Sequence, residues 1–188
     1  LPQQGGHHIR VFDNKSIDND TDNFAPEGNI VGEVPRGTGI IIMANSDVEI
    51  FNNLMSGNGT VNLSIVSYGD ETDDPNYYPH PKNIQVHGNI YGPSGFDPDI
   101  DTGDLAKALF EISGGNMPDI FWDGIVPISQ IIFGQPDDEK LIIAEKDATF
   151  LTIKPIKYML GLSDPVNTNK NDFKGDISPL EKITIETF

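Results

Sequence analysis

The chain has 188 residues, which is enough for one domain with a sizeable hydrophobic core. It carries 29 acidic residues against 12 basic ones, a formal net charge of −17. Because there is no Lys/Arg cluster, this balance excludes a nucleic-acid-binding protein and disfavours binding to an anionic membrane surface. The absence of cysteine excludes disulfides, thiolate metal sites and Cys nucleophiles, and no apolar stretch reaches the ~20 residues of a membrane span.

Three segments share one pattern, a short alternating strand that ends in a polar turn and an asparagine. They lie at 9–14, 48–53 and 84–89. The final asparagines are 39 and then 36 positions apart, and spacing of this kind indicates a repeat architecture. Asparagine tolerates left-handed turns, and its amide can bond to the next asparagine of a stack. We therefore expect Asn14, Asn53 and Asn89 to stack at one corner.

Runs of β-branched residues at 39–43 and 61–66 favour strands that are covered on both faces. Together these patterns predict an all-β fold, a right-handed parallel β-helix (solenoid), with residues 1–92 as its C-terminal coils. The spacing exceeds one coil, so we expect two loop insertions, at 18–37 and 69–81. Such insertions often gather on one binding face.

Residues 93–188 differ in character and are predicted to form a capping region packed on the last coil. Its one short α-helix is expected at 105–112, where the apolar residues fall on one stripe, and it ends at Gly114-Gly115. Further short strands are expected at 131–133, 141–144, 149–153 and 183–185. A cap of this kind covers the open β edges at the end of a solenoid.

Four motifs suggest a family: LPQ through RVFDN at 1–14, NFAP at 23–26, VEIFNN at 48–53, and MPDIFWDGIV at 117–126. Over about residues 1–130 they resemble a poorly characterised group of bacterial parallel β-helix domain proteins with a pectate-lyase-like solenoid. The resemblance implies an exported, often lipid-anchored protein with further coils before Leu1, of which this chain is the C-terminal part. The chain begins without an initiator Met or a signal peptide, which agrees with that expectation. No catalytic residue follows from the resemblance.

Two loops carry alternating carboxylates of the kind that surround calcium. Their candidate metal ligands are Asp18, Asp20 and Asp22 in the first loop, and Asp97, Asp99 and Asp101 in the second. Neither loop completes the EF-hand pattern, because its twelfth position lacks the bidentate Glu. The alternative is a pair of solvated acidic turns, with Asp101 as a helix cap. Calcium is the one candidate cofactor.

The loop around Tyr78, His80 and Lys82 holds the residue types that a lyase uses to abstract a proton, so these three are the catalytic candidates. Candidate ligand-binding residues are aromatic side chains that can stack on sugar rings, together with a nearby histidine: Tyr77, Tyr78, His87 and Trp122. The alternative is a Pro-rigidified loop packed on the fold, with Trp122 as the hydrophobic anchor of the cap.

These observations predict a non-catalytic exported protein that binds a glycan or a protein partner, in the periplasm, anchored to the outer membrane or outside the cell. One candidate protein partner is the N-terminal part of the same protein, which would precede Leu1. The alternative is a carbohydrate-active enzyme of the polysaccharide lyase or epimerase type. A third hypothesis is a subunit of a larger assembly, because the chain begins in mid-fold. The familiar hydrolase, P-loop, zinc-protease and dinucleotide motifs do not occur in the sequence.

Overall fold

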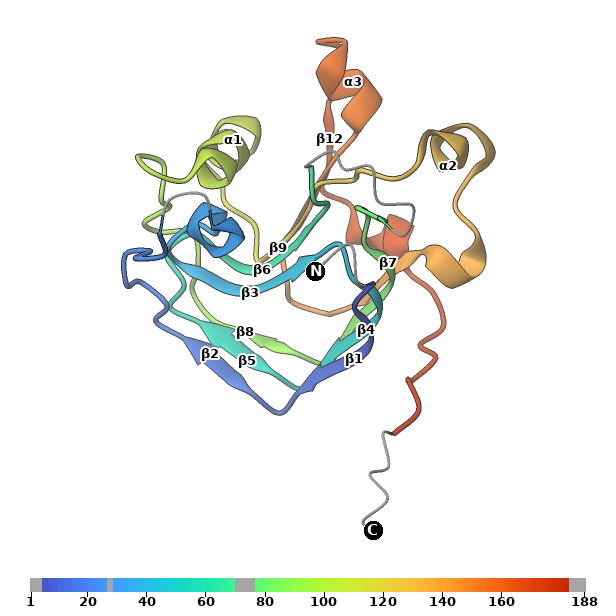
Figure 1. Ribbon diagram of the computed structural model, residues 1–188, viewed down its shortest axis with the longest axis horizontal. Coiled ribbons are helices and arrows are strands. Elements are labelled where there is room, and N and C mark those ends of the chain that lie inside the picture. The colour runs from blue at the N-terminus through green and yellow to red at the C-terminus, as the bar shows by residue number, and fades with distance from the viewer. Residues whose placement is uncertain (1–4, 27–28, 70–76, 183–188) are drawn as a thin grey trace.

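A computed structural model describes residues 5–26, 29–69 and 77–182, and its strands form three sheets around a shared core (Figure 1). The first sheet is parallel and contains β1 (His7–Phe12), β4 (Ser46–Phe51), β7 (Lys82–His87) and β10 (Leu141–Ala144). The second contains β3 (Thr38–Met43), β6 (Val61–Val66), β9 (Ile120–Trp122), β11 (Phe150–Ile153) and β12 (Val166–Asn167). The third contains β2 (Lys15–Ile17), β5 (Leu54–Ser56) and β8 (Ile90–Tyr91).

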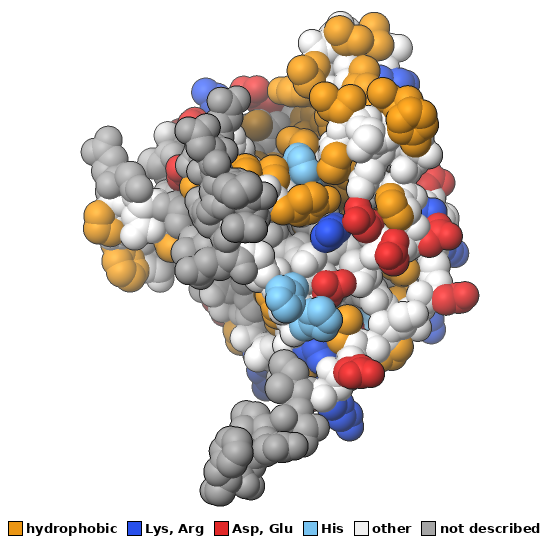
Figure 2. All heavy atoms as spheres, turned by 45° about the vertical axis from the view of Figure 1, so that its right-hand side comes forward, with side chains coloured by type: hydrophobic (Ala, Val, Ile, Leu, Met, Phe, Trp, Pro, Cys, Tyr) orange, Lys and Arg blue, Asp and Glu red, His pale blue; other side chains and the backbone are white. Residues whose placement is uncertain are grey.

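Short helices surround the sheets. They are α1 (Asp104–Ile112), α2 (Ile128–Phe133) and α3 (Pro155–Met159), with the 3-10 helices η2 (Ile30–Glu33), η3 (Asp137–Glu139) and η4 (Lys170–Phe173). Within the described residues, no helix has the length and apolar character needed to cross a bilayer. Several apolar side chains on α2 and α3 are exposed, and Figure 2 shows hydrophobic side chains gathered over α3 at the top of the molecule.

The core forms because the strands alternate their side chains between two faces. Val48 and Ile50 of β4 point inward and are fully buried, whereas Glu49 between them lies on the outer face of the first sheet. The second sheet carries apolar side chains on both faces, although β6 also buries Asn62 and Ser64. Ile42 of β3 belongs to the central core, and its neighbour Ile41 packs in a second cluster on the outer face. The outer face of the second sheet therefore needs a cover, and α1 supplies part of it.

The predicted asparagine stack is confirmed. Asn14 Nδ2 donates to Asn53 Oδ1 at 3.1 Å, and Asn53 Nδ2 donates to Asn89 Oδ1 at 3.0 Å. The residue before each asparagine has a positive φ, which turns the chain out of the first sheet. Glu145 ends the stack by accepting from Asn89 Nδ2 at 2.7 Å.

The predicted all-β right-handed parallel β-helix is wrong. Of the residues that the structure describes, 18% are helical and 32% lie in strands of several small parallel and mixed sheets. This is a mixed α/β fold, and no closed solenoid is found in the described part of the chain. After β8 the chain leaves the third sheet for a Gly/Pro loop and α1, and β10 and β11 then follow without a further strand in that sheet. Strand β12 pairs with β11 in the antiparallel direction. Strands from residues 93–188 extend both larger sheets.

Individual elements were predicted with mixed success. The helix at 105–112 is confirmed as α1, although its N-cap is Gly103 and makes no side-chain capping bond. The strand predicted at 131–133 is wrong, because these residues belong to the helix α2. Pro127 precedes α2 and Gly134 with φ 87° follows it, the usual boundaries of a short helix. The strand predicted at 183–185 lies outside the described residues.

Candidate functional site

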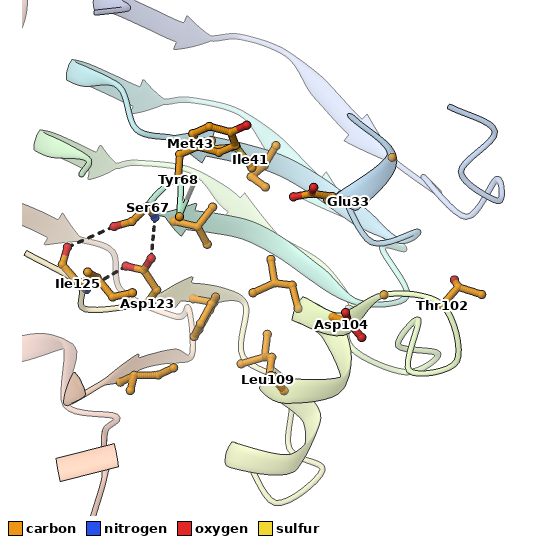
Figure 3. Close-up of a pocket in the computed structure, with 18 residues that line it drawn as sticks. Glu33, Ile41, Met43, Ser67, Tyr68, Thr102, Asp104, Leu109, Asp123 and Ile125 are labelled. Carbon is orange, nitrogen blue, oxygen red and sulfur yellow. Dashed lines mark hydrogen bonds between the residues drawn. The ribbon is translucent and has the colours of Figure 1, made fainter. Parts of the chain in front are cut away.

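A cavity of about 590 Å³ lies between the outer face of the second sheet and α1 (Figure 3). Its walls are apolar because β3, β6, β9 and β11 turn their second apolar face towards it. The apolar wall residues include Ile41, Met43, Val66, Phe121, Ile153, Leu105 and Leu109. A cavity of this size suits a small organic molecule.

Polar groups stand at the two ends of the cavity. Figure 3 shows Ser67, Asp123 and Ile125 meeting at one end, with Glu33 and Asp104 at the other. The charged side chains among the described lining residues are therefore all acidic, and none of these residues is lysine, arginine or histidine.

Asp123 is buried, and the backbone of two segments holds its carboxylate. Ser67 N donates to Asp123 Oδ2 at 2.6 Å, and Ile125 N donates to Asp123 Oδ1 at 3.0 Å. Burial raises the pKa of Asp123 to about 6, and the two N–H donors limit that rise by favouring the charged form. Asp123 is therefore a carboxylate that loses its charge near pH 6, at the edge of an apolar cavity.

The three catalytic candidates lie close together, next to Ser67 at the Asp123 end of the cavity. His80 Nδ1 is 3.3 Å from Ser67 Oγ, and the rings of His80 and Tyr78 meet edge to face with centroids 5.7 Å apart. Lys82 Nζ lies 4.7 Å from the centre of the Tyr78 ring and 3.5 Å from Glu139 Oε1. The loop and β7 thus bring Tyr78, His80 and Lys82 together, and Ser67 connects them to the cavity.

Burial sets the protonation of this cluster. It lowers the pKa of His80 and raises the pKa of Tyr78, and the Glu139 charge adds to the rise at Tyr78. Both groups are consequently neutral at pH 7. Among the described side chains no carboxylate hydrogen-bonds to His80, so Ser67, His80 and Asp123 do not form a nucleophile–base–acid relay.

The four predicted ligand-binding residues do not form one site. Tyr78 belongs to the cluster above, and the Tyr77 hydroxyl donates to the Tyr68 carbonyl at 2.9 Å. His87 lies on the outer face of the first sheet, 3.1 Å from Glu49 Oε1 and stacked on Phe51.

Trp122 is buried and meets Phe173 edge to face, so it offers no sugar platform. Trp122 belongs to the central core cluster, and its alternative role as the hydrophobic anchor of a cap stays a prediction.

The two predicted calcium loops meet at Arg36. Its Nε lies 3.5 Å from Asp22 Oδ1, and its Nη1 donates to Asp97 Oδ2 at 3.0 Å. The pKa of Arg36 is raised, chiefly by the hydrogen bond to Asp97. Within the part of the chain that the structure describes, no three His, Asp or Glu side chains gather as a metal site. A guanidinium therefore supplies the positive charge between these loops.

The other acidic residues of these loops serve the backbone or face solvent. Asp20 Oδ1 accepts from Gly59 N at 3.0 Å. Asp99 accepts from Arg36 N at 3.0 Å and from Thr102 Oγ1 at 2.6 Å. Burial opposes ionisation of Asp99, but these donors outweigh it and its pKa is lowered. Asp18 takes a positive φ, and Asp101 is exposed.

The comparisons with known proteins give no information on this site. Protein-family models, curated proteins and solved structures were all compared with the chain, and none matches. The family resemblance of the four motifs therefore stays a prediction.

Two residues of the cavity's polar end, Ser67 and Asp123, were not singled out from the sequence. The available signal was Asp123 itself, a carboxylate directly after the apolar run at 120–122 and directly before a glycine. A carboxylate in that position lies where a buried strand ends.

Proposed function

We propose that this chain is a non-catalytic binding protein whose ligand enters the cavity between the second sheet and α1. The ligand would have an apolar body and a cationic or hydrogen-bond-donating head. The observation that carries the proposal is the position of the buried Asp123 carboxylate at one end of an apolar cavity of about 590 Å³. An alkyl or aryl amine has this chemistry, because its hydrocarbon part fits the walls and its ammonium pairs with Asp123.

The chemistry behind the cavity supports binding over catalysis. Lys82, the strongest base by type, is paired with Glu139 and lies over the Tyr78 ring. Neutralising a uronate carboxylate, as a lyase requires, needs a cation in the site, but Glu33, Asp104 and Asp123 give the cavity the opposite charge. The lyase or epimerase alternative is therefore less well supported.

The predicted glycan ligand is less well supported, because Trp122 is buried and the cavity walls are aliphatic apart from Phe121 and Tyr68. We retain the proposal of an exported protein, which rests on the family resemblance of the four motifs.

The test uses a fluorescent probe, 1-naphthylmethylamine, and its neutral isostere 1-naphthylmethanol. At a pH of about 7.5 the amine is expected to bind at least about tenfold more tightly than the alcohol, because Asp123 is then charged. At a pH of about 5 the difference should shrink, since Asp123 takes up a proton near pH 6. Fluorescence anisotropy measures both affinities.

Variants locate the binding. Asp123→Asn should remove the preference for the amine, and Leu109→Trp should fill the cavity and weaken both probes. Leu160→Trp is the matched control, because Leu160 is exposed and does not line the cavity. Equal affinity for amine and alcohol at both pH values, or no effect of Leu109→Trp, would contradict the proposal.

A further inference from the structure

Residues 175–182, the C-terminal strap, cross the outer face of the first sheet. Figure 1 shows this segment leaving η4 and descending past β7, β4 and β1. It contains no regular secondary structure, and most of its residues are exposed. Its position therefore depends on what its backbone contacts on the sheet.

The strap follows one row of side chains across the sheet. Arg10, Glu49, Gln85 and Ile142 are register partners, one on each strand from β1 to β10. Gly175 lies against Ile142, where an added Cβ would come within 3.1 Å of the Ile142 side chain. At the other end, Lys182 lines a hollow of about 580 Å³ with Arg10, Phe12 and Phe51.

The central contacts are made to the strap's backbone. Gln85 Nε2 donates to the Ser178 carbonyl at 2.9 Å, and Ser178 N donates to Gln85 Oε1 at 2.7 Å. Leu180 N donates to Glu49 Oε2 at 3.2 Å. One amide side chain thus pairs with both polar groups of a single residue, as a neighbouring strand would, and a carboxylate takes the N–H two residues later.

The side chains that make these contacts are buried, and other residues hold them in position. Glu49 and Gln85 are 1% and 2% exposed under the strap. Arg10 Nε donates to Glu49 at 3.0 Å, and His87 Nε2 lies 3.1 Å from its other oxygen, so Glu49 is fixed in place. For Gln85, the strap supplies the side-chain partners found in the described residues. Buried amides normally have partners, so this position requires a peptide backbone or water.

We propose that this row, the Arg10–Glu49–Gln85 face, is a docking surface for an extended peptide segment of a partner protein, and that the strap is the intramolecular ligand that occupies it in the isolated chain. The hydrogen bonds of this face are made to backbone N–H and C=O groups. The ligand that matches them is therefore an extended peptide. The strap makes three such bonds and only two of its residues, Ile177 and Leu180, are partly buried. A partner with better side-chain contacts can therefore displace it.

The test uses the full chain with its strap released. Ser178→Pro with Leu180→Pro removes the two N–H donors and leaves the sheet unchanged. Glu181→Pro is the matched proline control, because Glu181 N makes no hydrogen bond found in the described residues. The probe is a fluorescent peptide with the sequence of residues 174–182, and anisotropy measures its binding. Near-UV circular dichroism of Trp122 confirms that each variant is folded.

The released chain is expected to bind the probe at least about tenfold more tightly than the parent or Glu181→Pro, because a tethered strap competes at high effective concentration. Adding Gln85→Leu to the released chain should reduce binding by about tenfold or more, since the amide pair is lost. Absence of binding to the folded released chain, or binding that Gln85→Leu leaves unchanged, would overturn the proposal. So would a parent dimer in light scattering that strap release abolishes, because the surface would then hold the strap of a second copy.

Discussion

At the scale of single residues, Asp123 is the clearest case of a carboxyl group whose burial disfavours its charged form. It is buried, it has two backbone donors, and among the described residues no cationic side chain contacts it. Burying a charge without a cation raises the free energy of the charged form. The pKa of about 6 expresses that cost.

This raised pKa predicts how stability depends on pH. Between about pH 4 and pH 6 the folded chain holds a proton on Asp123 that the unfolded chain has released, so the free energy of unfolding falls as the pH rises. From a pH of about 4.5 to about 7.5, Asp123 should lower the free energy of unfolding by about 2 kcal/mol. Asp123→Asn should remove this part of the pH dependence, as urea unfolding at the two pH values would measure.

The control for this prediction is Glu145→Gln. Burial also raises the pKa of Glu145, so this variant removes a different titrating carboxyl and should leave the Asp123 contribution in place. A pH dependence in Asp123→Asn that equals the parent's would show that Asp123 does not titrate in this range.

At the scale of the elements, two amide ladders connect the sheets, and a carboxylate ends each one. The first ladder runs from Asn14 through Asn53 and Asn89 to Glu145. In the second, each amide nitrogen again donates to the next oxygen, from Asn19 through Asn58 and Asn62 to Asp119. A carboxylate suits the last position because it accepts hydrogen bonds and leaves no N–H without a partner.

The ladder predicts that Asn53→Ala is strongly destabilising. Asn53 is fully buried, and its removal leaves Asn89 Oδ1, the Val11 carbonyl and the Phe51 carbonyl without this donor. We expect the free energy of unfolding to fall by about 2–4 kcal/mol, because buried polar groups lose their partners. Asn14→Ala, at the exposed end of the same ladder, should cost about 1 kcal/mol or less. Urea unfolding compares the two, and equal losses would contradict the ladder's role.

The sequence allowed the long strands and the first ladder to be predicted, because period-2 alternation and repeated asparagines are local signals. β1, β4, β6 and β7 lie where the pattern placed them. The strands β2, β5 and β8 have three residues or fewer, too few for a pattern to show. The apolar residues of α2 suggested a strand because a short apolar run does not distinguish the two.

The candidate site was less predictable than the strands. Tyr78, His80 and Lys82 lie within five positions, so their proximity followed from the sequence. Their connection to Asp123 did not, because it depends on the pairing of β6 with β9, which brings Ser67 beside a residue far along the chain. Likewise, Arg36 between the acidic loops could not be foreseen, since it lies in neither loop's motif.

At the scale of the whole molecule, a net charge of −17 means that each cation is placed among carboxylates that repel one another. Several cations consequently join distant segments. Arg10 connects β1 to β4, Lys82 connects β7 to η3, and Arg36 connects the two acidic loops. Removing one of them should leave behind a cluster of negative charge that another cation can neutralise.

Arg36 allows this to be tested. Arg36→Gln is expected to lower Tm by about 2–4 °C, because the pairs with Asp22 and Asp97 are exposed and each contributes little. About 5 mM calcium should restore part of that loss in the variant, since it can replace the lost positive charge, and should shift the parent by less. Lys107→Gln, which removes an equal charge from an exposed residue of α1, should show no such restoration. If calcium raises Tm of the parent as much as that of Arg36→Gln, the guanidinium does not hold the place of a metal ion between these loops.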